Sequence, residues 1–477
     1  MQEQILNFVA KANGILADYI LIFLLVAVGL FFTIKTRFVQ VRCFGEGMKK
    51  VFGNIKLVGG KNQGGLSSFQ ALATAIAAQV GTGNIVGASG AILTGGPGAI
   101  FWMWVIAFLG MATIYAEAVL AQDSRITDAN GEIHGGPVYY IKKAFPNGFG
   151  SFLAGFFAIA VILALGFMGS MVQSNSIAGS METVFDANKA NILFSLGGID
   201  VTVTAAIVGA IIAVVAAFIF IGGINRIASV TEKLVPIMAC LFLLGGLVVI
   251  FANITKIPAT FAMIFKYAFT PNALIGGGIG YALKTAISQG AKRGLFSNEA
   301  GMGSTPHAHA MANVEKPHDQ GVVAMVGVFI DTFVVLTMTA LVVITCLFTG
   351  IEATGDAASY AAALEGVTKA NAMQIAVSSV FKDFGSIFVA ICLLFFAFST
   401  ILSWNFFGKV NVQYLFKNNK IATVLYSVIA IVFIFLGALL SNDLVWELTD
   451  FFNYLMVIPN AIALFALYKV VVNASKK

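Results

Sequence analysis

Long apolar segments alternate with short polar ones along almost the whole chain. A helix that crosses about 30 Å of hydrocarbon needs about 20 residues, and windows of this length predict about eleven membrane spans. The predicted spans are residues 15–34, 68–94, 98–121, 150–182, 201–222, 234–253, 273–304, 321–348, 373–407, 421–440 and 449–468. The pattern therefore predicts an all-α, polytopic membrane protein embedded in a lipid bilayer.

Composition and charge exclude several other classes of protein. Of the 477 residues, 59% are of the types AVILMFWYC and 10% are charged, whereas an ordinary globular chain is about 25% charged. So few charges could not cover the surface of several soluble domains. The net charge of +6 does not indicate nucleic-acid binding, because the basic residues lie in short loops between spans. The four cysteines include no CxxC pair, so neither a disulfide framework nor a metal site is predicted.

The basic residues predict the orientation of the chain. The dense basic stretch after the first span consists of Lys35, Arg37, Arg42, Lys49, Lys50, Lys56 and Lys61. Such a stretch stays on the cytoplasmic side, which places the N-terminus outside, and alternation of the spans then places the C-terminus in the cytoplasm. No basic segment precedes the first span, so it is expected to be retained rather than removed as a signal peptide. The cytoplasmic membrane is the expected location.

Two of the predicted spans contain polar, glycine-rich interruptions. The span 68–94 contains the sequence GTGN at 81–84, and the span 273–304 contains SQG at 288–290. Unwound backbone at bilayer depth survives only where it lines a cavity or is buried in protein. Two interrupted helices at corresponding places predict an inverted-repeat core of five plus five helices. The expected units are residues 1–66 (a first helix and a basic amphipathic segment), a first repeat 67–254, an outer connection 255–272 and a second repeat 273–477.

The first interruption has the chemistry of a binding site for an amino acid and a cation. Freed N–H groups of Thr82 and Gly83 would face a carboxylate, while carbonyls of Ala77 and Val80 would suit sodium. The other interpretation is that the glycines only let helices pack closely. Function is favoured because Thr82 and Asn84 bring polar groups to the same point.

A cation needs oxygen ligands from more than one helix, and the span 373–407 offers the hydroxyls of Ser399 and Thr400. Hydroxyls in membrane helices often bond back to their own helix, so this pair gains meaning only beside Ala77 and Val80. Sodium is the expected ion.

At the second interruption, Ala286 to Gly290, freed carbonyls and the side chains of Ser288 and Gln289 could accept hydrogen bonds from an ammonium group. Phe167, in the middle of a long span, could close over a small ligand, although simple core packing explains it equally well.

Several charged or titratable residues lie at or near membrane depth. Glu117 and Asp331 are expected to form structural ion pairs, and Glu299 could help to gate the inner side beside Lys292 and Arg293. His307 and His309 are interpreted as cytoplasmic loop residues. The sequence has no GxxxxGK[ST], HExxH or GxSxG motif, so neither ATP-driven transport nor a familiar hydrolase centre is predicted.

Two long motifs resemble a known family. The segments GGPGAIFWMW at 95–104 and SQGAKRGLFSNEAGMGSTP at 288–306 are similar to signatures of the alanine/glycine:cation symporter family, the sodium:alanine symporters, within the amino acid-polyamine-organocation transporter superfamily. The resemblance covers essentially the whole chain. It implies sodium- or proton-coupled uptake of small neutral amino acids, alanine and glycine foremost, on the five-plus-five fold, and it implies no partner protein. We expect a sodium-coupled symporter that works by alternating access.

The segment QVGTGN at 79–84 also resembles the VG-x-GN turn of sodium-coupled neurotransmitter symporters. That resemblance implies that Thr82 and Gly83 meet the substrate carboxylate. It implies sodium ligands at Ala77, Val80, Ser399 and Thr400, and a second, substrate-linked sodium at Asn84. This chain departs from that pattern at Ala78 and at Gln79. Gln79 is long enough to contact the ligand directly, which argues against the second sodium.

Two alternatives remain open. A proton-coupled permease would belong to the same class, although Ser399 and Thr400 favour sodium. A multipass enzyme or a channel would belong to another class. An enzyme should show clustered His, Asp or Cys residues at one membrane face, and a channel should lack the pair of broken helices.

Overall fold

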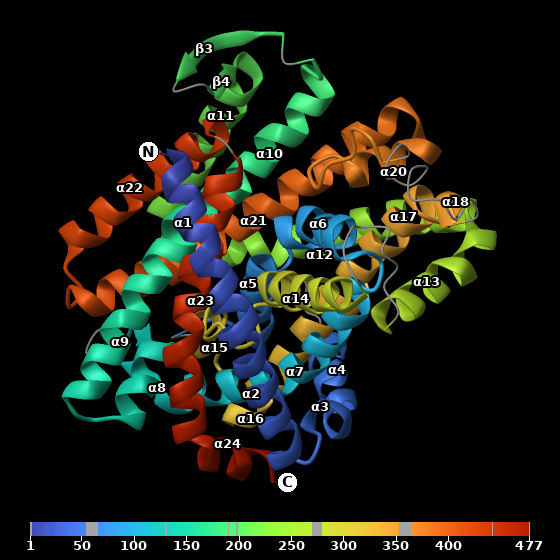
Figure 1. Cartoon of the computed structure of the whole chain (residues 1–477). Coiled ribbons are helices and arrows are strands. Elements are labelled where there is room, and N and C mark those ends of the chain that lie inside the picture. The colour runs from blue at the N-terminus through green and yellow to red at the C-terminus, as the bar shows by residue number, and fades with distance from the viewer. Residues whose placement is uncertain are drawn as a thin grey trace.

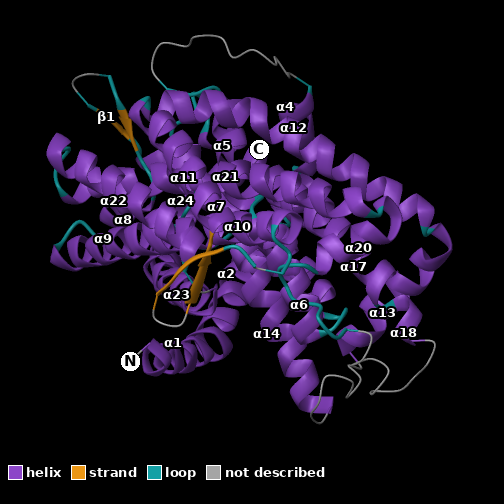
Figure 2. Cartoon of the chain, turned by 90° about the horizontal axis from the view of Figure 1, so that it is seen from above, coloured by secondary structure: helices purple, strands orange, loops and turns teal. Residues whose placement is uncertain are grey.

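The computed structural model describes residues 2–53, 65–128, 131–188, 190–196, 199–269, 279–352, 364–440 and 442–476. Lys56 and Lys61 of the basic stretch, and the predicted start of the span 273–304, lie outside these residues. Helices pack side by side, with the two chain ends at opposite ends of the bundle (Figure 1). Strands in the described residues form two short antiparallel hairpins, which stand out among the helices in Figure 2.

The elements follow the predicted spans closely. The first half contains α1 (Gln2–Ile15), η1 (Leu16–Leu21), α2 (Ile22–Lys35), α3 (Val39–Arg42), α4 (Phe44–Phe52), α5 (Ser68–Gln79), η2 (Gly83–Gly87), α6 (Ala88–Gly95), α7 (Ala99–Ser124), β1 (Ile126–Thr127), β2 (Ile133–His134), α8 (Pro137–Ala144), α9 (Gly148–Val161), η3 (Ile162–Gly169), α10 (Ser170–Phe185), β3 (Ile192–Leu196), β4 (Ile199–Thr202), α11 (Val203–Ile221) and α12 (Gly223–Ala252). The second half contains η4 (Ile254–Lys256), α13 (Ile257–Phe269), α14 (Ile279–Asn298), α15 (Pro306–Ala310), α16 (Pro317–Val328), η6 (Phe329–Leu336), α17 (Thr337–Leu347), α18 (Thr349–Glu352), α20 (Ala372–Phe381), α21 (Asp383–Leu415), α22 (Lys420–Leu439), α23 (Asn442–Ala466) and α24 (Tyr468–Ser475).

Ten of the predicted spans are confirmed by length and apolarity. In the described residues, 9 continuous helices are long and apolar enough to cross a membrane, and the bent pair α5 and η2–α6 makes up to 10. The remaining predicted span is α14, which contains Lys284, Lys292 and Arg293 and is therefore too charged to be recognised by composition. The predicted limits of the span 373–407 are wrong. Lys382 has a left-handed φ of 53° and separates the short α20 from the long α21.

The first predicted interruption is confirmed. A capping box starts α5, in which the Ser67 side chain accepts from the backbone N–H of Gln70 and the Gln70 side chain accepts from that of Ser67. The helix ends at Gln79, Val80 has a non-helical ψ of 87°, and the chain resumes at a 45° bend. The unwound residues are fully buried, as unpaired backbone at membrane depth requires.

The second interruption lies in a different place from the one predicted. Helix α14 is continuous through Ala286–Gly290 and ends at Asn298. The break follows at residues 299–305, where Glu299, Gly301 and Gly303 have φ values of 58°, 94° and 79°. Only glycine adopts such angles freely, so the EAGMG segment, and not the single Gly290, stops the helix.

Gly290 serves helix packing instead. A Cβ placed on it would lie 2.6 Å from Trp102 Cβ and 2.7 Å from the Ala99 carbonyl oxygen of α7. The absent side chain therefore allows α14 and α7 to approach closely. A lone glycine costs a helix only about 1 kcal/mol relative to alanine, which such packing can offset.

The two breaks meet in the middle of the bundle. The Gln79 side chain donates from Nε2 to the Asn298 carbonyl oxygen at 2.7 Å, joining the end of α5 to the end of α14. A Cβ on Gly83 would lie 3.0 Å from the Phe296 ring and 3.2 Å from Ser297 Cα. The backbone of the first break therefore packs directly on the end of α14.

Candidate functional site

Oxygen atoms of α5 and α21 converge at the first break. Thr400 Oγ1 donates to the Ala77 carbonyl oxygen at 2.8 Å, and Ser399 Oγ lies 3.4 Å from the same oxygen. Thr400 Oγ1 also lies 3.4 Å from the Ala78 carbonyl oxygen. All of these residues are buried. Two hydroxyls and two carbonyls from two helices form a donor set suited to a hard cation.

Val80, which also belongs to the predicted cation set, is buried at the break as well. The Val80 N–H donates to the Ile76 carbonyl oxygen at 2.7 Å, which is the last helical hydrogen bond of α5. Ser399 Oγ and Thr400 Oγ1 also lie 2.9 and 3.1 Å from the Phe396 carbonyl oxygen, so the single hydrogen of each hydroxyl is shared between its own helix and α5. The back-bonding interpretation and the contact with α5 therefore both hold for these hydroxyls.

Gln173 of α10 meets the freed backbone at Thr82. The backbone N–H and the hydroxyl of Thr82 both donate to Gln173 Oε1, at 3.0 and 2.6 Å. The acceptor is an amide oxygen placed where the start of η2 presents positive partial charge. A carboxylate oxygen would satisfy the same two donors. Gln173 was not identified from the sequence, because one glutamine in a span has no local signal.

Gln79 carries a buried acceptor with no partner. Its Nε2 is held by Asn298, while its Oε1 has no hydrogen-bond partner among the described residues. Leaving a buried polar oxygen unpaired costs about 1–3 kcal/mol, unless a ligand or water donates to it. A Cβ on Gly327 of α16 would lie 3.2 Å from this oxygen, so the Gln79 side chain lies between the end of α14 and α16. Its contact with a ligand stays a prediction.

Asn84 links the first break to Asp331 of η6. Asn84 Oδ1 accepts from the Gly81 N–H at 3.0 Å, and its Nδ2 donates to Asp331 Oδ1 at 2.6 Å. The hydroxyls of Ser297 and Thr332 also donate to the Asp331 carboxylate, at 2.9 and 2.8 Å. The expected ion pair of Asp331 is wrong, since no basic side chain of the described residues pairs with it.

Glu117 of α7 holds the second break. Its carboxylate accepts from the backbone N–H groups of Gly301 and Gly303 at 3.1 and 2.9 Å. It also accepts from Asn460 Nδ2 at 2.6 Å. Among the residues that the structure describes, these donors take the place of the expected basic partner of Glu117. The carboxylate satisfies peptide groups that the broken helix leaves unpaired.

Glu299, His307 and His309 are buried, which corrects the interpretation of the two histidines as loop residues. Glu299 accepts hydrogen bonds from the Ser304 hydroxyl and from Trp404 Nε1 and so lies in the second break, while its part in an inner gate stays a prediction. The His307 ring contacts the Ser304 carbonyl oxygen and Asn411, while the His309 ring contacts Gln320. The two histidines brace α15 rather than lie in a solvated loop.

Four of the predicted substrate residues lie away from the breaks. Ser288 donates to Asp18 of η1 at 2.6 Å, and a Cβ on Gly95 would lie 3.2 Å from Gln289 Cβ. Gly290 faces α7, as described above. The Phe167 ring stacks on Phe433 of α22 with centroids 4.9 Å apart, so its position agrees with core packing. The prediction for Ser288, Gln289 and Gly290 depended on a break at 286–290, whereas α14 is continuous there and the break follows at residues 299–305.

Almost the whole chain matches one known protein family. Residues 2–477 match the sodium:alanine symporter family. The chain belongs to that family. The sodium/alanine symporter AgcS of Methanococcus maripaludis is 39% identical over 99% of this chain and 97% of its own length. The probable sodium/glutamine symporter GlnT of Bacillus subtilis is 38% identical over 100% of this chain and 91% of its own. An uncharacterised transporter of Haemophilus influenzae is 40% identical over 96% of this chain and 92% of its own.

A solved structure supports the fold of this sodium:alanine symporter family member. The crystal structure of MhsT in complex with L-phenylalanine has a TM-score of 0.56 and covers 87% of this chain and 100% of that one, at 15% identity. The inverted-repeat core with two discontinuous helices is thereby confirmed. The chain is a multi-pass membrane transporter and not an enzyme, as its named relatives are transporters and symporters.

A buried ion pair lies beside the breaks of this family member. The Arg293 guanidinium of α14 binds the Asp450 carboxylate of α23 at 2.9 and 3.3 Å. It also lies 5.1 Å from the centre of the Trp446 ring, which in turn packs on Phe296. The Arg293 and Asp450 side chains are only 18% and 7% exposed. This cluster joins the last turns of α14, just before the second break, to α23.

We expect Asp450→Asn to lower amino-acid uptake at least tenfold. The substitution leaves the Arg293 charge buried and unpaired, a change that typically costs about 3–5 kcal/mol. Uptake of radiolabelled alanine into proteoliposomes measures the effect, with Asp443→Asn as the matched control. Asp443 is 76% exposed and lies 3.6 Å from Lys369, so its loss should change little. Equal uptake by the two variants would contradict a role for the Arg293–Asp450 pair.

Proposed function

We propose that the chain is a sodium-coupled symporter that imports small neutral amino acids, alanine and glycine foremost, by alternating access. The observation that carries the proposal is the convergence of the Ser399 and Thr400 hydroxyls on the Ala77 carbonyl oxygen beside unwound backbone. In this proposal Ala77, Val80, Ser399 and Thr400 hold one sodium ion. The names of the sodium/alanine symporter AgcS and the probable sodium/glutamine symporter GlnT support the choice of ion.

The amino acid would bind between the two breaks. Its carboxylate would take the Thr82 and Gly83 N–H groups, with Gln173 Oε1 moving away from Thr82. Its ammonium group would donate to Gln79 Oε1, the buried acceptor that has no partner in the described residues. A small side chain is favoured, because the residues around Thr82 are fully buried and closely packed.

The proposed location is the cytoplasmic membrane. In the proposed orientation the N-terminus lies outside the cell and the C-terminus lies in the cytoplasm. The positive-inside rule supports it, and so do chain ends that lie at opposite ends of the bundle (Figure 1). In this orientation the Arg293–Asp450 pair lies on the outer side of the breaks. Rocking of the two repeats, residues 67–254 and 273–477, would expose the site to each side in turn.

Asp331 favours a second candidate function, proton coupling. Its carboxylate is fully buried beside Asn84, and no basic residue pairs with it in the part of the chain that the structure describes. A carboxylate in this setting could carry a proton across the membrane. The same position, next to Asn84, would also suit a second sodium ion. A relative in Bacillus subtilis is named a putative sodium/proton-dependent alanine carrier, so both ions deserve a direct test.

Uptake of radiolabelled alanine into proteoliposomes tests the proposal. An inward sodium gradient should drive accumulation, while a proton gradient alone should not. A tenfold gradient contributes about 1.4 kcal/mol and 100 mV about 2.3 kcal/mol per charge, enough to concentrate a neutral solute several-hundred-fold. Competition by unlabelled glycine, alanine and glutamine ranks the substrates. Accumulation driven by protons without sodium would overturn the ion assignment.

Asp331→Asn separates the two ions. If sodium alone drives transport and does not bind at Asp331, the variant should keep its sodium dependence and should show no change in its pH profile. Loss of sodium dependence without a change in the pH profile would instead indicate a second sodium ion at Asp331. If Asp331 carries a coupling proton, the variant should lose accumulation but keep alanine exchange, which requires no net proton movement. Asp200→Asn is the control, since Asp200 lies in the exposed β3–β4 hairpin.

A further inference from the structure

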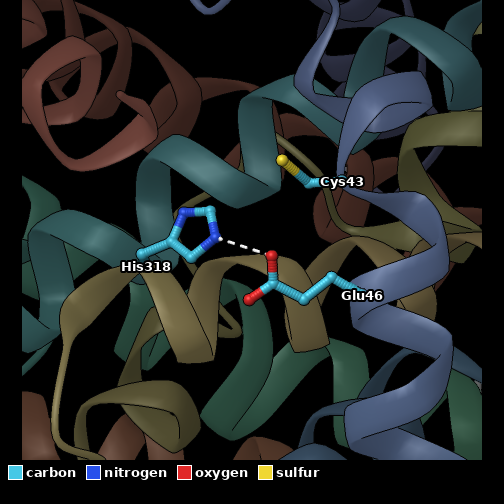
Figure 3. Close-up of side chains that lie close together, drawn as sticks. All are labelled: Cys43, Glu46 and His318. Carbon is cyan, nitrogen blue, oxygen red and sulfur yellow. Dashed lines mark hydrogen bonds and ion pairs between the residues drawn. The ribbon is translucent and has the colours of Figure 1, made fainter. Parts of the chain in front are cut away.

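A thiol, a carboxylate and an imidazole lie together where α4 packs against α16. Cys43 directly precedes α4, Glu46 lies in its first turn, and His318 lies in the first turn of α16 (Figure 3). One ligand atom from each residue lies within 4.8 Å of the others. None of these three residues belongs to the cation or substrate site proposed above.

Local structure explains why the three side chains meet. Cys43 and Glu46 are three residues apart, and residues at this spacing share one face of a helix. Pro317 occupies the first position of α16 and starts the helix, which places His318 at its beginning. Figure 3 shows Cys43 and Glu46 reaching from one ribbon and His318 from another, toward a common point.

The donor set matches a borderline-soft divalent cation. Zinc binds cysteine sulfur, histidine nitrogen and carboxylate oxygen at about 2.0–2.3 Å, so ligand atoms in a tetrahedral site lie about 3.5 Å apart. Glu46 Oε2 and His318 Nε2 are already 3.4 Å apart. Small side-chain rotations would bring the Cys43 sulfur to the same separation.

The surroundings orient the imidazole toward the cluster. The Tyr115 hydroxyl lies 2.7 Å from His318 Nδ1, which leaves Nε2 directed at Glu46. Histidine ligands of metals usually have their second ring nitrogen fixed by such a partner. Cys43 and His318 are 5% and 3% exposed, whereas the Glu46 side chain is 31% exposed. The open side at Glu46 gives an ion a way in and leaves room for water as a fourth ligand.

Lys50 is a competing charge beside the cluster. Its ammonium lies 3.9 Å from Glu46 Oε1, but it is closer to Asp319, at 3.2 Å. The second oxygen of Glu46 faces His318, so Lys50 does not block the side where a metal would bind. A second acidic cluster, Asp128, Glu132 and His134, has no thiol and lies mostly at the surface.

We propose that Cys43, Glu46 and His318 form a site for Zn²⁺ or a similar transition-metal ion. The ion would tie the amphipathic helix α4, which leads from the first span, to α16 of the second repeat. This proposal differs from the prediction made from the sequence, in which four scattered cysteines indicated no metal site. The histidine is 272 residues from Glu46, so spacing along the chain could not reveal the cluster.

Cobalt binding tests the proposal, because Co²⁺ replaces Zn²⁺ and its absorption spectrum reports thiolate ligation. The full-length protein, purified in detergent and freed of metal with a chelator, should bind one equivalent of Co²⁺ with a thiolate charge-transfer band. Zn²⁺ should displace it, and excess Mg²⁺ should not. Cys43→Ser should abolish the band, while Glu46→Gln and His318→Gln should weaken Co²⁺ binding at least tenfold.

Two controls locate the site. Cys240→Ser removes an exposed cysteine elsewhere, and His134→Gln disrupts the second cluster, so both should keep the band. Size-exclusion chromatography confirms that each variant is folded. Glu46 is partly exposed, so Glu46→Gln is expected to fold. This variant tests the metal site even if His318→Gln does not fold. A band that survives Cys43→Ser, or unchanged Co²⁺ affinity in Glu46→Gln, would overturn the proposal.

Discussion

Thr400→Ala is expected to raise the sodium concentration for half-maximal alanine uptake about ten- to a hundred-fold. The Thr400 hydroxyl lies 2.8 Å from the Ala77 carbonyl oxygen, where the proposed ion would sit between α5 and α21. Contacts of a polar group with a charge contribute about 1.5–3 kcal/mol, and 1.4 kcal/mol corresponds to a tenfold change in affinity. Alanine affinity measured at saturating sodium should change much less.

A second threonine provides the matched control. Thr423 in α22 donates to the Asn419 carbonyl oxygen of its own chain segment at 3.0 Å. Thr400 makes the same kind of back-bond, to Phe396, but adds the contact with α5. Thr423→Ala should therefore leave sodium dependence unchanged. If Thr400→Ala behaves like Thr423→Ala, the sodium ligand has been assigned to the wrong residue.

Two further substitutions at Thr400 separate the role of its hydroxyl from that of its shape. Thr400→Ser keeps the hydroxyl and should retain most of the sodium affinity, whereas Thr400→Val keeps the shape and should lose it. The comparison separates the loss of an oxygen ligand from the loss of packing against Gly81, whose Cβ would lie 2.4 Å from Thr400 Oγ1. Sodium titrations of uptake in proteoliposomes measure all three variants under the same conditions.

The first break was predictable from sequence because its signal is local. Gly81, Thr82 and Gly83 bring two helix-breaking residues and an unmatched hydroxyl into three consecutive positions of an apolar span. The contact of Ser399 and Thr400 with α5 was also expected, because cation binding requires oxygens from a second helix and few spans offer adjacent hydroxyls. Their role as sodium ligands stays a prediction.

The second break was misplaced because glycine alone does not end a helix. Gly290 is accommodated by packing against α7, whereas Glu299, Gly301 and Gly303 adopt left-handed backbone. The φ values of a turn depend on what its freed N–H groups can bind, and their acceptor, Glu117, is 184 residues from Gly301. Such long-range partners, like Gln173 at Thr82, leave no pattern in the local sequence.

Glu117→Ala is expected to abolish alanine uptake and to destabilise the protein by about 3–5 kcal/mol. The carboxylate accepts from the N–H groups of Gly301 and Gly303 and from Asn460. Each buried donor left unpaired costs about 1–3 kcal/mol, and water cannot readily replace the carboxylate in a fully buried site. The second break should then lose its shape, together with the site that it forms with the first.

Glu117→Gln tests whether the hydrogen bonds of the Glu117 carboxylate, and not only the volume of its side chain, hold the second break. Glutamine keeps one acceptor oxygen but turns an amide NH₂ toward a backbone N–H, so we expect a loss intermediate between wild type and Glu117→Ala. Asp123→Ala on the same helix is the control. Asp123 pairs with Lys143 at 2.7 Å near the surface, where such a pair contributes about 0–1 kcal/mol. Thermal unfolding in detergent and alanine uptake should rank Asp123→Ala close to wild type, then Glu117→Gln, then Glu117→Ala. If Glu117→Ala unfolds and transports like Asp123→Ala, the second break is held by its own backbone angles and not by this carboxylate.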